Sequence, residues 1–551
     1  MVEASIIREN SFNLKINFWV IGTWITSAIL IAPILTLFIT ASGDSEGLWK
    51  HLFETVLAKY IYNTILLMLG VSILALLIGV LSAWIISRYN FFGKKYFDWL
   101  LMLPIACPAY LVAYAYTDFF EYAGPIQGYL RNIFNWNSAQ DYWFPEIRSL
   151  GGAIFVMSFV LYPYVYVLAR TAFIKSPSSF YEIASIYNKH QFYNVALPIA
   201  RPAIFAGLAL VCMEVISDFG TVEFFTVETL TLGIFNVWLG MNNLAAAAQI
   251  SIIAFIFVIS LIFIEIKSRS NKRFSNTSQN QRNMKSINLN FNAQILCILF
   301  CLTPSIIGFF LPVFLLISHA LKTSYHQDWI EMIFIIRNTV FCSFFGALSI
   351  VIIGSLMALV SFYKGSRYLK NFVAIASTGY AFPGTMLSIG VLVFCGFFDK
   401  LFTLGSKYIF GLSQNGLISG TIIILLIAYI VRFQAVGFGA IRSGITQIPL
   451  NLMDASQSMG KSFKESLFVV IFPLLKTYVL AGGLLAFVDI MKELPMTILL
   501  RPFNFETLAT YAYQFAHDEL IEQAALPALL IIFAGLIPVI FLNKFLRESK
   551  F

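Results

Sequence analysis

Residues Pro449–Pro473 read PLNLMDASQSMGKSFKESLFVVIFP, a polar and charged interruption in a sequence that is otherwise almost entirely apolar. The pattern predicts two short helices separated by a break at Gly460, because glycine readily takes the left-handed conformation that ends a helix. Ser462 and Glu465 have the spacing of a capping box, which begins the second helix. A folded helix pair at the rim of apolar segments indicates a surface that packs against a partner.

The composition places the chain in a lipid bilayer. Hydrophobic residues make up 59% of the 551 residues and charged residues 12%, with a mean hydropathy of +0.80. A soluble globular chain carries about 25% charged residues. The excess of Lys and Arg over Asp and Glu, 36 to 28, is therefore interpreted as a signal of membrane topology, and no nucleic-acid partner is expected.

Twelve apolar runs approach or exceed the roughly 20 residues that a spanning helix needs, which predicts an all-α integral membrane protein. The first run is too long for the core of a signal peptide and is expected to be retained. The runs are Phe18–Thr40, Ile61–Ile86, Phe97–Phe119, Leu150–Phe173, Pro202–Val215 with its continuation, Ala248–Ile266, Gln294–Ser318, Val340–Phe362, Phe372–Phe394, Leu417–Val436, Leu474–Ile490 and Ala524–Phe541.

The distribution of Lys and Arg predicts the orientation. If the amino terminus is cytoplasmic and the runs alternate, 26 of the 36 basic residues fall on the cytoplasmic side, with Arg432 counted among them. Cytoplasmic loops are enriched in Lys and Arg. Both termini and the stretch Pro449–Pro473 are therefore expected to be cytoplasmic.

The sequence repeats itself at an offset of 275 residues, which predicts a tandem duplication of a six-span unit with the substrate path between the halves. The matched landmarks are Asn63-Thr64 with Asn338-Thr339, Pro108 with Pro383, Pro198 with Pro473, and Glu214 and Asp218 with Asp489 and Glu493. Pro108 and Pro383 lie inside apolar runs, where they are expected to kink a helix for gating or for packing.

The duplication divides the chain into five expected parts. Residues 1–56 form an N-terminal segment with the first transmembrane helix, and residues 57–266 form the first copy of the repeat. Residues 267–292 are basic and rich in Ser and Asn, which is typical of a linker. Residues 293–333 hold the first helix of the second half, and residues 334–545 form the second copy.

The counterpart of the opening stretch is Ser179–Pro198, SFYEIASIYNKHQFYNVALP. Ser179 and Glu182 have capping-box spacing, and Asn188 stands where Gly460 stands. The segment from Asn188 to Pro198 is three residues shorter than the one from Gly460 to Pro473. The contact around Asp454 is therefore expected to be the better formed of the two.

The two loops resemble the EAA loop of ABC importer permeases. The matching residues are Asp454, Ala455, Gly460 and Pro473 in the second half, and Glu182, Ala184, Asn188 and Pro198 in the first. The resemblance implies two tandem type-1 permease domains whose loops each bind one of two cytoplasmic ATPase subunits. It departs from the family pattern at Asp454, where the family has Glu, and at Asn188, where it has Gly.

Other stretches are similar to fused two-domain permeases of ferric iron importers. They are Tyr142–Arg148, Ser217–Val222, Met491–Pro495 and Leu500–Phe503. This similarity implies a bacterial inner-membrane protein that receives iron from a periplasmic binding protein. A permease of the same build for thiamine or another small solute is the alternative, and a secondary transporter driven by an ion gradient is an alternative of another class.

The residues Gly460-Lys461-Ser462 resemble the end of a phosphate-binding loop. That motif needs a glycine five residues before the Gly-Lys pair, and Ala455 stands there. The chain is therefore not expected to be an enzyme or to hold a cofactor, and ATP hydrolysis is assigned to a separate subunit.

Ionisable residues within apolar runs are functional candidates because charge is costly in a bilayer. Glu214 and Asp218 are expected to share a helix face, as are Asp489 and Glu493, with Lys492 beside them. The candidates for a gate or a cation path are Glu214, Asp218, Asp489, Lys492, Glu493, Tyr110 and Tyr114. In a gate, the acids would pair with Lys492, Arg148 or Arg501.

Carboxylate and phenol oxygens suit a hard cation, but a permease should hold its cargo weakly, so no tight metal site is expected. Cys297 and Cys301 share a helix face and are interpreted either as a metal pair or, without a nearby His or carboxylate, as small packing residues.

Replacing Gly460 with Val is expected to uncouple ATP hydrolysis from transport while the protein still folds. A β-branched residue resists the left-handed conformation that the break requires. The measurement is transport and ATP hydrolysis by the reconstituted complex in vesicles. Full transport by the variant would contradict a left-handed break at this position.

Overall fold

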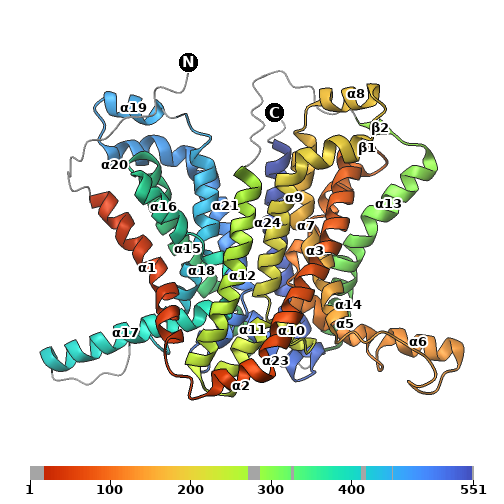
Figure 1. Cartoon of the computed structure of the whole chain (residues 1–551), viewed down its shortest axis with the longest axis horizontal. Helices are drawn as coiled ribbons and strands as arrows, with labels where there is room; N and C mark the ends of the chain where they lie inside the picture. The colour runs from red at the N-terminus through yellow and green to blue at the C-terminus, as the bar shows by residue number, and fades with distance from the viewer. Residues whose placement is uncertain (1–17, 271–285, 324–327, 411–416, 450, 549–551) are drawn as a thin grey trace.

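Helices make up almost all of the regular structure (Figure 1). The computed structural model describes every residue except 1–17, 271–285, 324–327, 411–416, 450 and 549–551. In the described part of the chain, the two short strands β1 (Tyr89–Asn90) and β2 (Ile287–Asn288) pair in parallel. Eleven described helices are long and apolar enough to cross a membrane, or twelve if one bent pair is counted as a span.

The first half comprises α1 (Phe18–Ala41), α2 (Leu48–Thr55), α3 (Leu57–Arg88), α4 (Lys94–Leu100), η1 (Leu103–Ala106), α5 (Ala109–Phe120), α6 (Pro125–Phe134), α7 (Leu150–Ile174), α8 (Ser178–Ile186), η2 (Phe192–Ala196), α9 (Leu197–Ser217), α10 (Gly220–Phe224), α11 (Leu230–Phe235), η3 (Asn236–Gly240) and α12 (Leu244–Ser270). Most of the expected linker lies outside the described residues.

The second half comprises α13 (Phe291–Ser305), η4 (Ile306–Phe310), α14 (Leu311–Thr323), α15 (Trp329–Tyr363), α16 (Arg367–Ala376), η5 (Gly379–Ala381), α17 (Gly384–Phe410), α18 (Ile422–Ile445), α19 (Asn451–Ser458), α20 (Phe463–Ser466), η6 (Leu467–Ile471), α21 (Phe472–Met491), α22 (Pro495–Leu500), α23 (Leu508–His517) and α24 (Ile521–Glu548).

The third predicted span is broken in both halves. In the first half, the helical segments on either side of the break meet at 91°, and Pro108 directly precedes α5. Pro383 stands in the same place before α17. Proline is well suited to the start of a helix, because it has no N–H to donate and disfavours helical conformation in the residue before it. The span therefore bends at Pro108 as expected, but the bend is a break between two helices and not a kink inside one continuous helix, and Pro383 likewise follows a break.

The repeat is visible in matched hydrogen bonds. Thr64 Oγ1 accepts from the backbone N–H of Leu230 at 3.0 Å, and Thr339 Oγ1 accepts from that of Leu508 at 2.8 Å. The preceding asparagines also make equivalent contacts, Asn63 with Glu228 and Asn338 with Glu506. In each half, the same Asn-Thr pair therefore links the second span, α3 or α15, to the start of a short helix, α11 or α23.

The first helix of each half packs against the other half. Helix α1 lies against α15, α16 and α17, and the α13–η4–α14 segment lies against α4, α5 and α7. Thr36 Oγ1 on α1 donates to the carbonyl of Gly390 on α17 at 2.8 Å. On the other side, the Tyr116 hydroxyl donates to the carbonyl of Ile307, and His319 Nε2 lies 3.0 Å from Asp118 Oδ2. This exchange ties the two halves together at both flanks.

Gly390→Ala is expected to lower the stability of the protein by about 1–3 kcal/mol, the range for overpacking a tight contact. A Cβ at Gly390 would lie 2.0 Å from the carbonyl oxygen of Pro33, so α1 and α17 would have to separate. Gly396→Ala on the same helix is the control, because a Cβ there meets nothing within 4 Å. Thermal unfolding of the detergent-solubilised chain measures the difference, and equal midpoints for both variants would contradict the close contact.

Candidate functional site

The loop of the second half forms the predicted pair of short helices. Gly460 has φ +87° and ends the segment that contains α19. Ser462 Oγ accepts from the backbone N–H of Glu465, and Glu465 Oε2 accepts from that of Ser462 at 2.8 Å. The predicted break and capping box are therefore confirmed. A buried hydrogen bond of 2.9 Å between Ser456 and Ser466 holds α19 against α20.

The loop of the first half has the same left-handed break at Asn188, with φ +51°. The capping box predicted at Ser179 and Glu182 is wrong. Pro177 occupies the N-cap position of α8, and no side chain caps that helix. Ser179 is therefore the second residue of the helix and does not occupy the N-cap position.

A glutamine connects α8 to the following helix in place of the serine pair. Gln191 Nε2 donates to Ser185 Oγ at 2.6 Å and to the carbonyl of Tyr181 at 3.2 Å. Its Oε1 accepts from Arg88 Nη2 at 2.6 Å, which also fastens the loop to the end of α3. Helices α8 and α19 have nine and eight residues, so both loops are folded.

The second helix of each loop continues directly into the fifth span. The chain is helical from Phe463 to Met491 and from Phe192 to Ser217. Pro473 and Pro198, the last residues of the two quoted stretches, each lie inside a helix, with one residue between the proline and a preceding π-helical turn, η6 or η2. A proline lacks an N–H and its ring crowds the carbonyl four residues earlier, which the wider π turn accommodates. Each loop thus lies at the end of one continuous helix, or rod, that crosses the protein.

Helices α8 and α19 lie at opposite edges of one face of the molecule (Figure 1). Glu182, Asp454 and Ala455 are exposed there, whereas Ala184 is buried. Large apolar side chains are also exposed, with Ile186 at 78% and Met459 at 75%. Both loop tips therefore present apolar side chains at the surface of the molecule.

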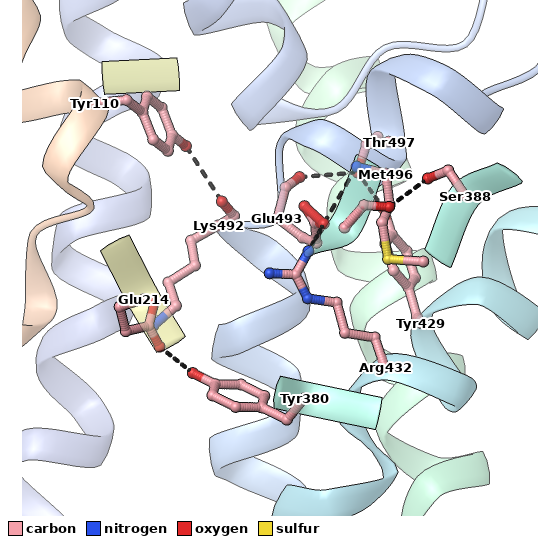
Figure 2. Close-up of polar contacts among 11 residues, drawn as sticks. Tyr110, Glu214, Tyr380, Ser388, Tyr429, Arg432, Lys492, Glu493, Met496 and Thr497 are labelled. Atoms are coloured by element: carbon pink, nitrogen blue, oxygen red, sulfur yellow. Dashed lines mark hydrogen bonds and ion pairs between the residues drawn. The ribbon is translucent and has the colours of Figure 1, made fainter. Parts of the chain in front are cut away.

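A pocket of about 110 Å³ lies between the halves and is lined by all four acids predicted from the repeat. Asp489 Oδ1 lies 2.8 Å from Lys492 Nζ, and Glu493 Oε1 forms an ion pair with Arg432. Figure 2 shows Glu214, from the first half, accepting a hydrogen bond of 2.5 Å from the Tyr380 hydroxyl of the second half. The acids are therefore held in two ways, by cations within the second half and by a phenol across the interface.

Two of the acids do not share a helix face with their neighbours, contrary to the prediction. Helix α9 ends at Ser217 and α21 ends at Met491, so Asp218 and Glu493 lie beyond the helix ends. Asp218 accepts from the backbone N–H and the hydroxyl of Thr221, both at 2.9 Å, and Glu493 accepts from the N–H of Met496 at 3.2 Å. Each carboxylate accepts a hydrogen bond from a backbone N–H in the first turn of the next short helix, α10 or α22. The N–H groups of a first turn have no partner within their own helix.

The tyrosines differ from the prediction in part. Tyr110 lines the pocket, and its hydroxyl donates across the interface to the carbonyl of Lys492 at 3.4 Å (Figure 2). Tyr114 is buried against Phe224 and is not among the residues that line the pocket. In the described part of the chain, no three His, Cys, Asp or Glu side chains are grouped so that they could hold a metal ion.

Sequence reasoning missed three lining residues, Tyr164, Tyr380 and Arg432. Arg432 was counted as a cytoplasmic charge, but it lies in the interior of α18. Its position inside the apolar run Leu417–Val436 could have identified Arg432 as a candidate from the sequence. The repeat gave no signal, since the residues 275 positions before Tyr380 and Arg432 are Ile105 and Met157.

The face opposite α8 and α19 carries further contacts between the halves. Arg148 pairs with Glu121 of its own half and, at 3.2 Å, with Glu519 of the other. His517 Nε2 lies 3.5 Å from Glu223 Oε1, again across the interface. Burial raises the pKa of Glu223, and His517 offsets part of this rise.

Two basic residues considered as partners of the central acids bind elsewhere. Arg148 pairs with Glu121 and Glu519, and Arg501 pairs with Glu506. Of the three candidates, only Lys492 forms an ion pair with one of those acids.

Comparison with known proteins gives one family match in each half of the chain. Residues 75–275 and 350–549 match the family described as binding-protein-dependent transport system inner membrane component. The chain is 24% identical over 541 residues to the Fe(3+)-transport system permease protein FbpB 2 of Haemophilus influenzae, which covers 95% of this chain and 98% of that protein. It is 21% identical over 525 residues to the ferric transport system permease protein FbpB of Actinobacillus pleuropneumoniae, which covers 89% and 72%.

A shorter match involves a protein named for another solute. The sulfate transport system permease protein CysW of Escherichia coli is 26% identical over 209 residues, which are 37% of this chain and 68% of that protein. The family match in both halves confirms the resemblance predicted from the two loops.

Arg432→Met is expected to destabilise the protein by about 3–5 kcal/mol, because it leaves the carboxylate of Glu493 buried without its cation. The double variant Arg432→Met with Glu493→Gln is expected to recover much of this loss. Arg442→Met, on an exposed position of the same helix, is the control. The thermal unfolding midpoints of these variants are compared in detergent. An equal loss of stability in the single and double variants would show that Arg432 and Glu493 are not coupled.

Proposed function

Since the chain belongs to the family of binding-protein-dependent transport system inner membrane components, we propose that it is the permease of an ATP-driven importer of ferric iron. A periplasmic binding protein delivers the cargo, and two cytoplasmic ATPase subunits bind the loops that contain α8 and α19. The two relatives named for ferric iron each match most of the chain, while the sulfate relative matches 37% of it.

The observation that carries the cargo assignment is the charge of the central pocket. Four carboxylates and two cations line it, together with the phenols of Tyr110, Tyr164 and Tyr380. Both cations form ion pairs with second-half acids, and the Lys492 side chain also extends toward Glu214 (Figure 2). Glu214 accepts from the Tyr380 hydroxyl, and Asp218 accepts from the hydroxyl and the backbone N–H of Thr221. Hard trivalent cations prefer oxygen ligands of this kind. An oxyanion such as sulfate would be repelled by the excess of negative charge.

The two rods connect the loops that bind the ATPase to the central pocket, so movement of the ATPase subunits is transmitted to the pocket along these helices. The helix from Phe463 to Met491 begins in the second loop and ends beside Asp489 and Lys492. The helix from Phe192 to Ser217 joins the first loop to Glu214 in the same way. A push on either loop by a closing ATPase is transmitted along a helix to the pocket, because a helix resists compression along its axis better than a chain of loops does.

The bonds that cross the interface at the pocket are the ones such a movement would break. The Tyr380–Glu214 and Tyr110–Lys492 hydrogen bonds each join one half to the other. The ion pairs Lys492–Asp489 and Arg432–Glu493 lie within the second half and would move with it. Separation of the halves therefore exposes Glu214 to the cargo while the second-half charges stay neutralised.

Glu214→Gln is expected to reduce ATP-dependent iron uptake about tenfold, because the cargo loses its contact with one carboxylate and a charge-assisted contact contributes about 1.5 kcal/mol. Glu522→Gln, on an exposed side chain of α24, is the control and is expected to transport normally. Uptake is measured in vesicles that contain the permease, its ATPase and its binding protein.

Each alternative has its own outcome in that assay. Uptake that persists without the ATPase and follows a proton or sodium gradient would overturn the importer proposal in favour of a secondary transporter. A partner binding protein that binds thiamine or sulfate and not iron would overturn the cargo assignment alone.

A further inference from the structure

A second and larger hollow lies away from the central pocket. It is a groove of about 790 Å³ along the seam between α15 and α21, closed at one end by Trp19 of α1 and by Phe468. Its α15 wall runs from Phe344 to Val360, a length of about 24 Å at the helical rise of 1.5 Å per residue. Both walls belong to spans, so the groove opens into the bilayer.

One of the lining residues is a glycine, which lets the two walls of the groove approach each other closely. Gly483 lies on the α21 wall, and a Cβ at that position would come 3.1 Å from Val351 on the opposite wall. The first half has Leu208 at the equivalent position, 275 residues earlier. Folded proteins do not leave large apolar hollows unfilled, since the walls lose dispersion contacts. In a bilayer, the hydrocarbon that reaches this groove is a lipid chain.

Positive charge is placed at the end of the groove near α20. Lys476 is exposed and lies one turn from both Phe472 and Leu480, which line the groove, so the three share a helix face. Lys364 Nζ lies 3.9 Å from the ring centre of Phe463, whose ring also packs against Trp19. A lysine beside an apolar groove can lay its methylene chain on the apolar surface and extend its ammonium to the level of the headgroups.

We propose that this groove binds one anionic phospholipid, with an acyl chain along the α15–α21 seam and its phosphate at Lys476. The lipid would lie along the wall that contains Gly483 and contact the exchanged helix α1 through Trp19. This site is independent of the cargo and of the central pocket. It commits to a phospholipid because apolar spans form both walls and a cation marks one end.

The test counts lipids on the full chain by native mass spectrometry, after purification in detergent and addition of phosphatidylglycerol or phosphatidylcholine. The wild-type chain is expected to retain one phosphatidylglycerol in preference to phosphatidylcholine. Gly483→Leu, which installs the residue of the first half, is expected to lose that lipid. Gly439→Leu is the control, because a Cβ there meets nothing within 4 Å. Lys476→Gln is expected to keep a lipid but lose the preference for phosphatidylglycerol.

A second filling variant, Leu348→Phe on the α15 wall, tests the same point if Gly483→Leu does not fold. Retention of the lipid by a folded filling variant would overturn the proposal. Equal loss of lipid from Gly439→Leu would do so too, as would equal retention of both lipids by the wild-type chain. A polypeptide held in the groove in place of a lipid would also overturn it.

Discussion

Charge buried in a bilayer must be neutralised inside the protein, because no water is present to solvate it. This constraint organises the interface between the halves. Lys492 and Arg432 form ion pairs with two carboxylates of the second half, while Glu214 and Asp218 of the first half accept hydrogen bonds from hydroxyl and backbone N–H groups. The hydrogen bonds across the pocket are made by the phenols of Tyr380 and Tyr110.

The same constraint shapes the path from loop to pocket. A backbone that crosses a bilayer must satisfy its own hydrogen bonds, and a local change of helical register is one way to accommodate a proline within a span. The π turns before Pro198 and Pro473 provide that change and keep each helix continuous. A third π turn, η4, precedes Pro312 in the same way. The loops and the acids are thereby joined by single helices instead of flexible links.

The exchange of first helices gives the two halves a second connection that the pocket does not provide. Helix α1 packs on the second half through the close approach of Pro33 to Gly390, and the Tyr116–Ile307 bond holds the other exchanged helix. The halves are thus fastened at their flanks by the exchanged helices and bridged in the middle by hydrogen bonds. The groove beside α1 lies at one of these flanks, where a bound lipid would contact the exchanged helix and the rod of the second half together.

Local patterns in the sequence were sufficient for the features that depend on neighbouring residues. Apolar run length predicted the spans, Gly460 and Asn188 predicted the breaks in the loops, and the 275-residue offset led to the four acids, because such signals are encoded within a few turns of chain. The tertiary structure alone decided which residues meet across the interface. Tyr380 and Arg432 have apolar counterparts in the first half, so the repeat concealed them, and Asp218 left its expected helix face because the next helix required a cap. The hollow beside Gly483 likewise depends on the packing of α15 against α21, which no local pattern specifies.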